Sequence, residues 1–174
     1  SLAAALAIHD VGERSSALAT LVPALQGETK EMALQAGLNA AFAIQDEGKR
    51  CRALVALAPS LHGETREKTL QAGLVAALSI QDEWRRSDAL AALVPGIQGE
   101  TRKKAMQAGL DAALSIHDEL LRSDALAALA PNLQGELLRT ALDAALSIHD
   151  EWHRSDTLAA LAPNLQGELL RTAL

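Results

Sequence analysis

The chain has 174 residues, of which 49% are hydrophobic and 22% charged, and its formal net charge is −6 at pH 7. This composition excludes wholesale disorder, because it supplies enough apolar surface to form a packed core. Ala and Leu dominate the hydrophobic residues, whereas the chain has one Phe, two Trp and no Tyr. Since Ala and Leu favour helices and strands favour β-branched and aromatic residues, the composition predicts an all-α protein.

The charge pattern and the apolar runs argue against several classes of partner. The chain has no block of Lys and Arg and few aromatic side chains, so we expect no nucleic-acid partner. No apolar run approaches the about 20 residues of a membrane span, and the N-terminal SLAAALAI lacks a basic signal region. Cys51 has no second cysteine to pair with, which fits a reducing compartment or a secreted domain that needs no disulfide. We expect a soluble, cytoplasmic protein.

The strongest signal in the sequence is an internal repeat. The tripeptide Ile-(His/Gln)-Asp recurs at intervals of 36, 36, 36 and 32 residues, and the pair Gly-Glu recurs at the same intervals. Two independent markers with one period predict an array of repeated units. The tripeptide ends at Asp10, Asp46, Asp82, Asp118 and Asp150. The stretches 118–142 and 150–174 differ only at 120/152, 121/153 and 125/157, which points to recent duplication or to a designed array.

These markers predict one repeat array over residues 1–174. A partial repeat, 1–9, corresponds to the tail of a second helix, and a truncated repeat, 150–174, ends the array. The complete repeats are 10–45, 46–81, 82–117 and the 32-residue repeat 118–149. Neither end carries a polar capping repeat, so we expect a fragment of a longer array, or ends that stack head to tail on other molecules.

Each repeat predicts two helices. The first begins at the repeated Asp, a favoured N-cap residue, and the Arg four residues later is expected to form an ion pair with it. Its apolar stripe runs to a proline that ends the helix, at Pro23, Pro59, Pro95, Pro131 and Pro163. The second helix is predicted from Gly-Glu to the next Ile, as from Glu64 to Ile80.

Small residues in the middle of the second helix predict a close helix–helix approach. Ala36-Gly37, Ala72-Gly73 and Ala108-Gly109 occupy this place, where glycine costs about 1 kcal/mol relative to alanine. The 32-residue repeat lacks the four residues that match 101–104, close to one helical turn, so its buried face stays nearly in phase. Because one hairpin cannot bury its own apolar stripe, the sequence predicts an α-solenoid of stacked antiparallel helical hairpins.

The repeated phrase Asp-Glu-x-x-Arg-Ser-x-Ala-Leu-Ala-Ala-Leu resembles the first helix of HEAT-like repeats. The 36-residue period is nearer to the tetratricopeptide class, although the Trp, Tyr and Phe pattern of that class is missing. Ala- and Leu-rich phrases such as LAALAP also resemble the arrays attached to bacterial signalling ATPases of the NACHT and NB-ARC type. These resemblances imply protein recognition and name no ligand.

No set of residues predicts catalysis. His149 and His153 have the spacing of an HExxH metal motif, but Asp150 stands where the Glu should be and is the predicted N-cap. His149 should therefore lie outside the helix. Other repeats have Ser at the position of Cys51, and no general base accompanies that position. With no glycine-rich phosphate loop either, we expect no enzyme, no cofactor and no metal.

Positions that differ between repeats are the candidates for partner binding. One such position lies on the second helix, with a recurring Gln one turn earlier, and another lies in the first turn of the first helix. An exposed Trp is a frequent interface anchor, and the alternative is that it covers the adjacent repeat. The candidate partner-binding residues are Gln35, Asn39, Gln71, Val75, Gln107, Asp111 and Asp143 on second helices, and Trp84 and Trp152 on first helices.

Two functions follow from this sequence. The first is an interaction scaffold that binds a peptide or protein on one face of a short right-handed solenoid. The second is a structural module that associates with itself head to tail or acts as a spacer. The identity of a partner is open at this point.

Overall fold

The computed structural model describes residues 1–165, which contain ten α-helices, five short 3-10 turns and no strand. The chain forms two compact units, Ser1–Ile80 and Gln81–Leu174. The all-α fold of helical hairpins is confirmed. That all repeats form one array stays a prediction. None of the helices in the described region is long and apolar enough to cross a membrane.

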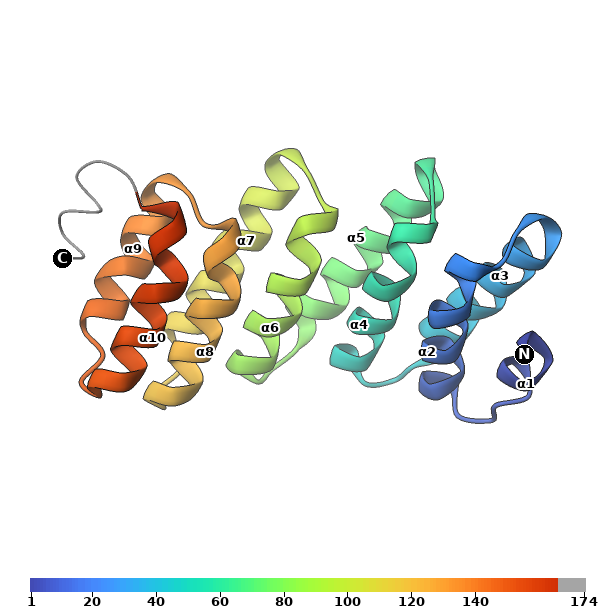
Figure 1. The fold of residues 1–174 in the computed structure, drawn as a ribbon, viewed down its shortest axis with the longest axis horizontal. Coiled ribbons are helices and arrows are strands. Elements are labelled where there is room, and N and C mark those ends of the chain that lie inside the picture. Colours follow the sequence, from blue (N-terminus) through green and yellow to red (C-terminus); the bar gives the residue numbers. More distant parts are fainter. Residues whose placement is uncertain (166–174) are drawn as a thin grey trace. The chain divides into compact units, whose positions relative to one another are not determined.

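The first unit contains two helical hairpins preceded by a short helix. Its first helices, α2 and α4, pack against each other as well as against the second helices, α3 and α5 (Figure 1). Each first helix runs directly into a 3-10 turn that contains the repeated proline. The elements are α1 (Leu2–Leu6), α2 (Val11–Leu21), η1 (Val22–Ala24), α3 (Gly27–Ala43), α4 (Glu47–Leu57), η2 (Ala58–Ser60) and α5 (Gly63–Ser79).

The second unit repeats this arrangement. The first helices α6, α8 and α10 pack in sequence, and each of α6 and α8 also contacts the second helix that follows it. The helix of the 32-residue repeat, α9, has 12 residues against 16 in α7, so the deletion does remove about one turn. The elements are α6 (Glu83–Leu93), η3 (Val94–Gly96), α7 (Gly99–Leu114), α8 (Glu119–Leu129), η4 (Ala130–Asn132), α9 (Gly135–Leu146), α10 (Glu151–Leu161) and η5 (Ala162–Asn164).

The repeated Asp is the N-cap of every first helix, as predicted. In each case its side chain accepts a hydrogen bond from the backbone N–H three residues later. The bond from Lys49 to Asp46 Oδ1, for example, is 2.7 Å long. An N-cap of this kind stabilises a helix by about 1 kcal/mol, because it satisfies a backbone donor that has no partner inside the helix.

The ion pair predicted between this Asp and the following Arg is wrong. In four repeats the Arg Nη1 donates instead to the carbonyl of the Ile that precedes the Asp by two residues, as from Arg50 to Ile44 at 2.8 Å. That Ile is the C-cap of the second helix in α3, where the last carbonyls have no helical partner. The guanidinium therefore caps the preceding helix while the Asp caps the following one. The other three bonds join Arg14 to Ile8, Arg122 to Ile116 and Arg154 to Ile148.

The second helices begin at a glycine with a left-handed backbone. Gly27 has φ +54°, and the equivalent Gly63, Gly99 and Gly135 have similar values. Side chains other than hydrogen are strained in this conformation, which accounts for the glycine of the repeated Gly-Glu pair. The glutamate lies in the first turn, where its charge suits the helix dipole. The predicted span Glu64–Ile80 agrees with α5 (Gly63–Ser79) to within one residue at each end.

The small residues of the second helices mark a close approach, as predicted. A Cβ added to Gly37 would lie 3.1 Å from Leu57 Cδ2 and 3.5 Å from Leu18 Cβ. Gly109 has the same relation to Leu129, at 3.1 Å, and to Leu90, at 3.4 Å. Because the second helix passes two successive first helices at this distance, a larger side chain would force the helices apart.

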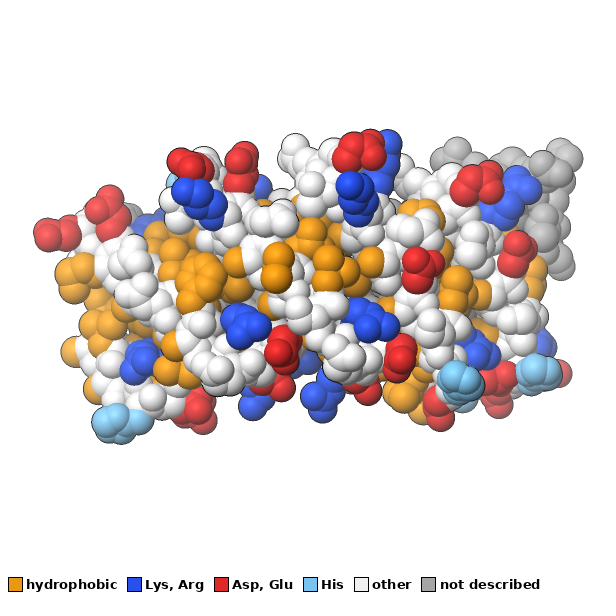
Figure 2. Space-filling model, turned by 180° about the vertical axis from the view of Figure 1, so that it is seen from behind, with side chains coloured by type: hydrophobic (Ala, Val, Ile, Leu, Met, Phe, Trp, Pro, Cys, Tyr) orange, Lys and Arg blue, Asp and Glu red, His pale blue; other side chains and the backbone are white. Residues whose placement is uncertain are grey.

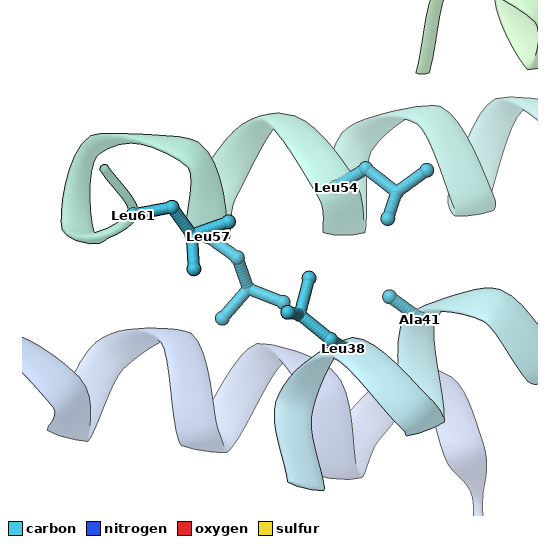
Figure 3. Close-up of a cluster of buried hydrophobic side chains, with 5 residues drawn as sticks. All are labelled: Leu38, Ala41, Leu54, Leu57 and Leu61. Carbon is cyan, nitrogen blue, oxygen red and sulfur yellow. The ribbon is translucent and has the colours of Figure 1, made fainter. Parts of the chain in front are cut away.

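Leucine and alanine fill the space between the hairpins. Leu38 and Ala41 of α3 lie against Leu54, Leu57 and Leu61, which all come from the next hairpin (Figure 3). Leu54 and Leu57 are almost completely buried. Full burial of a leucine contributes about 1.5–3 kcal/mol, so the core forms where successive hairpins stack.

The hydroxyl of a buried serine at one repeat position has different hydrogen-bond partners in different repeats. Ser15 Oγ donates to the Gly37 carbonyl at 3.2 Å. Ser123 Oγ lies 2.7 Å from Thr157 Oγ1 and 3.2 Å from the His153 carbonyl. Ser87 occupies the equivalent position, is fully buried, and its hydroxyl has no hydrogen-bond partner. An unpartnered buried hydroxyl costs stability, because it has lost its bonds to water.

We predict opposite responses when these serines are replaced by alanine. Ser123→Ala should lower the free energy of unfolding by about 1–2 kcal/mol, because it removes a bonded buried hydroxyl. Ser87→Ala should leave the free energy of unfolding unchanged or raise it, because no bond is lost. Urea unfolding of the two variants against the parent checks this, and a larger loss for Ser87→Ala would contradict the assignment.

Candidate functional site

The candidate residues predicted on second helices are all exposed. Gln35 and Asn39 lie on α3, and Gln71 and Val75 lie on α5, in the first unit. In the second unit, Gln107 and Asp111 lie on α7 and Asp143 lies on α9. This face of each unit also exposes apolar side chains between charged ones (Figure 2).

Two pairs among these candidates are already hydrogen-bonded within one helix. Gln35 Nε2 donates to Asn39 Oδ1 at 3.0 Å, and Gln107 Nε2 donates to Asp111 Oδ1 at 2.8 Å. Gln71 faces Val75 at the same spacing, and Val75 is 57% exposed. In two of the three helices that carry this Gln, a partner that bound its amide would have to break an existing hydrogen bond. The case for this face as a polar recognition site is therefore weaker.

Sequence reasoning missed an apolar row near the C-terminal ends of the second helices. One position per repeat carries a large apolar side chain that stays exposed, including Phe42 at 52% and Leu78 at 48%. The signal was present in the sequence as an apolar residue two positions before each repeated Ile, and it was masked by the Ala- and Leu-rich surroundings. The row consists of Leu6, Phe42 and Leu78 in the first unit and Leu114 and Leu146 in the second.

A groove lies between the first helices α2 and α4 of the first unit. It is open to solvent and has a volume of about 890 Å³. Small residues line it on both sides, among them Gly12 and Ser16 of α2 and Ala53 and Ala56 of α4. The remaining lining residues are Asp10, Glu13, Ala17, Ile44, Lys49, Arg52 and Val55. None of the candidate residues predicted from the sequence lines this groove.

The rim of this groove carries charges of opposite sign on its two sides. Asp10 and Glu13 belong to the α2 side, and Lys49 and Arg52 belong to the α4 side. Asp10 accepts the capping bond from the Glu13 backbone at 2.8 Å, so its carboxylate is held in place. The floor is formed by alanine and other apolar side chains, so the groove combines an apolar floor with a polarised rim.

The groove lies beside a position that varies between repeats. Gly12 is the second residue of α2, and α4 also has a glycine, Gly48, at this place. The second residues of α6, α8 and α10 are Trp84, Leu120 and Trp152. Gly12 lines the groove, so a small residue at this position helps to keep the space open. The variation is visible in the sequence, where it points only to the tryptophans as binding candidates.

The two tryptophans differ in exposure. Trp84 is half-buried, whereas Trp152 is 68% exposed. The helix α8 follows α6 and packs against it. Trp152 presents its indole to solvent in the described structure, so of the two it is the one that keeps the features of an interface anchor.

A carboxylate bridges two repeats in the second unit. Glu119 of α8 accepts hydrogen bonds from His149 Nδ1 at 2.7 Å and from the backbone N–H groups of His149 and Asp150 at 3.2 Å each. Arg122 Nη2 lies 3.6 Å from the same carboxylate. The bond from the His149 side chain, followed by the two backbone bonds, lowers the pKa of Glu119 to about 2. The ionised carboxylate thus fastens the loop before α10 to the start of α8.

His149 lies outside the helix, as predicted. The helix α10 begins at Glu151, with Asp150 as its N-cap, and His149 is engaged with Glu119. His153 lies one turn into the helix, with Nδ1 3.2 Å from Asp150 Oδ1. Among residues 1–165 no group of three His, Cys, Asp or Glu side chains is arranged to hold a metal ion. Cys51 is buried in α4.

Comparison of the chain with protein-family models, with curated proteins and with solved structures finds no match. The argument for function therefore depends on the exposed surfaces of the molecule itself.

We predict that the two tryptophans contribute unequally to stability. Trp84→Ala should lower the free energy of unfolding by about 1–3 kcal/mol, because its indole is half-buried. Trp152→Ala should change it by less than about 0.5 kcal/mol, because most of its indole is already in water. Thermal and urea unfolding of both variants checks this order. Equal losses would contradict the difference in burial.

We predict that the Glu119 bridge makes stability depend on pH under acidic conditions. The pKa of Glu119 is lower in the folded chain than its usual 4.5, so its contribution is present above pH 4.5 and is lost as pH falls toward 2. Glu119→Gln should therefore be less stable than the parent at pH 7, and the difference should vanish near pH 2.

Glu151→Gln is the matched control, because Glu151 has the same place at the start of α10. His149→Gln should weaken the pH dependence but keep part of it, since both backbone bonds remain. Urea unfolding at a series of pH values between 2 and 7 is the measurement. A difference between Glu119→Gln and the parent that persists at pH 2 would refute the bridge.

Proposed function

We propose that this protein is a binding module that holds a peptide segment of a partner protein in the groove between α2 and α4. The observation that supports this proposal is the groove itself, which has a volume of about 890 Å³ and lies between the two first helices of the first unit. Gly12 lines this groove, whereas α6 has a large side chain, Trp84, at the same place in its repeat. Recognition of a protein is also what the repeat architecture and its family resemblances imply.

The shape and chemistry of the groove favour a polypeptide segment over other ligands. The groove is open along the surface, whereas small-molecule sites enclose most of their ligand. Its rim carries both acidic and basic side chains, which suits the mixed charges of a peptide better than a polyanion such as nucleic acid.

The groove supports this proposal better than the second-helix face does. On that face, Gln35 and Gln107 donate to neighbours in their own helices, and the apolar row is flanked by charged residues. In the groove, an apolar floor is accessible from solvent between two polar rims. A concave apolar surface with a polar rim is the usual anatomy of a peptide-binding interface.

We predict that filling the groove from within abolishes peptide binding. Peptides selected from a displayed random library on the full chain should bind the parent, and Gly12→Trp should weaken them at least tenfold. The Trp should be accommodated, because Trp84 and Trp152 follow an identical N-cap Asp in other repeats. Isothermal titration with the selected peptides measures the loss.

Gly12→Ala is the control for the loss of glycine. Its Cβ would lie 3.2 Å from Asp10 Oδ1 and would leave the groove open, so binding should stay within about threefold of the parent. Circular dichroism of both variants verifies the fold. Failure to select any peptide, or selected peptides that bind Gly12→Trp as well as the parent, would overturn the proposal.

A further inference from the structure

We propose that the second unit has an interaction surface of its own, at the edge where its last hairpins join, and that this surface binds a basic amphipathic segment of a partner protein. This junction surface lies at the C-terminal ends of α7 and α9 and the N-terminal ends of α8 and α10. It shares no residue with the groove between α2 and α4, and the proposal does not depend on that groove. Its exposed apolar side chains are Leu114, Leu120, Leu121, Leu146 and Trp152.

The large apolar side chains that stay exposed in the described part of the second unit all lie at this edge. Each of the five is within three residues of one of the two turns, 115–118 and 147–150, that join a second helix to the next first helix. The opposite edge of the unit, with its prolines and Gly-Glu pairs, exposes no Leu, Ile, Val or Trp among the described residues. Single exposed apolar residues are common on any protein, whereas a cluster marks an interaction site.

Tertiary contacts bring the two junctions together into one surface. Helices α8 and α10 pack against each other. Glu119, in the first turn of α8, accepts hydrogen bonds from the side chain and the backbone N–H of His149 at the second junction. The first turns that carry Leu120 and Trp152 are therefore neighbours, and their exposed side chains belong to the same edge of the unit.

The junction surface also differs from the earlier junctions in its charge. The segments 111–122 and 143–154, which span the two junctions, each contain three acidic residues and one arginine. The equivalent segments 39–50 and 75–86 each contain two acidic and two basic residues. Formal negative charge at pH 7 is thus highest where the exposed apolar side chains are most numerous. Acidic and His side chains lie beside apolar ones along this edge, at the lower right of Figure 2.

The two arginines of these segments do not neutralise the surface carboxylates. Arg122 and Arg154 are partly buried and donate to the Ile carbonyls of their own junctions. Asp143 and Glu151 are exposed and form no ion pair in the described part of the chain. Asp111 accepts a hydrogen bond from the neutral amide of Gln107, which leaves its charge uncompensated.

This combination of side chains selects one kind of occupant. Carboxylates beside large apolar side chains are complementary to a segment in which Lys or Arg flanks Leu or aromatic residues, as on a basic amphipathic helix. An anionic lipid surface would be repelled by the same carboxylates. A second copy of the chain brings a net charge of −6 and hence no basic excess.

The test uses three acetylated and amidated peptides on the full chain. The basic probe is KLAKLLKKLAKLLK, whose leucines have helical spacing. Its acidic counterpart has Glu for every Lys, and its polar counterpart has Ser for every Leu. Isothermal titration should show saturable binding of the basic probe, with the other two at least about tenfold weaker, because each lacks one of the two interactions. In ¹⁵N–¹H spectra, the basic probe should shift the amides of Leu120, Leu146 and Trp152.

Two double variants separate the apolar contribution from the charge. Trp152→Ala with Leu120→Ala should weaken the basic probe by roughly tenfold or more, because it removes two exposed anchors. Asp143→Asn with Glu151→Gln should weaken it by roughly threefold to tenfold at low salt and by less at high salt, where exposed charges are screened. All four side chains are exposed, so circular dichroism should show an unchanged fold.

Matched controls come from the first unit. Phe42→Ala removes an exposed apolar side chain two positions before a repeated Ile, as Leu146 is. Glu47→Gln neutralises the first residue of α4, which is equivalent to Glu151 of α10. Gly12→Trp alters the groove between α2 and α4. All three should bind the basic probe within about twofold of the parent, so failure of the groove proposal and failure of this one are distinguishable.

Several results would overturn the inference. These are equal affinity for the basic and acidic probes, full affinity in a folded Trp152→Ala, Leu120→Ala variant, or amide shifts confined to the first unit. Binding to phosphatidylserine vesicles that the same double variant abolishes would assign the surface to a lipid instead. Concentration-dependent self-association that Trp152→Ala abolishes would assign it to a second copy of the chain.

Discussion

Every hairpin in this chain carries an apolar stripe that it cannot remove from water by itself, and burial of that stripe against the next hairpin is the constraint on which the structure depends. Leu54 and Leu57 of one hairpin are buried against Leu38 and Ala41 of the preceding one. The contact requires close approach, and Gly37 allows it at a distance where a Cβ would meet Leu57. Stability therefore depends on packing between repeats as well as within them.

The junction between successive hairpins is held by bonds to the backbone. The Asp caps the helix that begins, the Arg donates to the end of the helix before it, and the Ile that precedes the Asp is buried, as at Asp46, Arg50 and Ile44. These two bonds to the backbone and the burial of the Ile fall within seven residues, so they restrict the conformation of the junction.

Within the repeated arrangement of helices, a single residue that differs between repeats changes the local contacts. Ser123 has hydroxyl and carbonyl partners in the next repeat, whereas Ser87 has none. Glu119 gathers three hydrogen bonds from the loop before α10. Gly12 lines the groove between α2 and α4, whereas α6 has Trp84 at the same place in its repeat. The two walls of the groove are the first helices of adjacent repeats, which the same stacking brings together.

The sequence by itself determined the helices and their order. Asp N-caps, prolines and the Gly-Glu pairs are local signals, and they predicted α5 to within one residue at each end because capping and helix termination depend on neighbours in the chain. The small residues at Gly37 and Gly109 likewise predicted the close approach. Differences between repeats pointed to Asn39 and Val75, with Gln35 and Gln71 one turn earlier, and all four are exposed.

Only the tertiary structure decided where the junction Arg points and where the surface is hollow. The spacing of Asp and Arg suggested an ion pair, but a carbonyl without a helical partner lies within reach once the preceding helix ends beside the next one. The groove at Gly12 depends on the distance and orientation of α2 and α4, which are far apart in sequence. A glycine leaves no recognisable pattern in a single helix, and a groove forms beside it only where the neighbouring helix supplies the opposite wall.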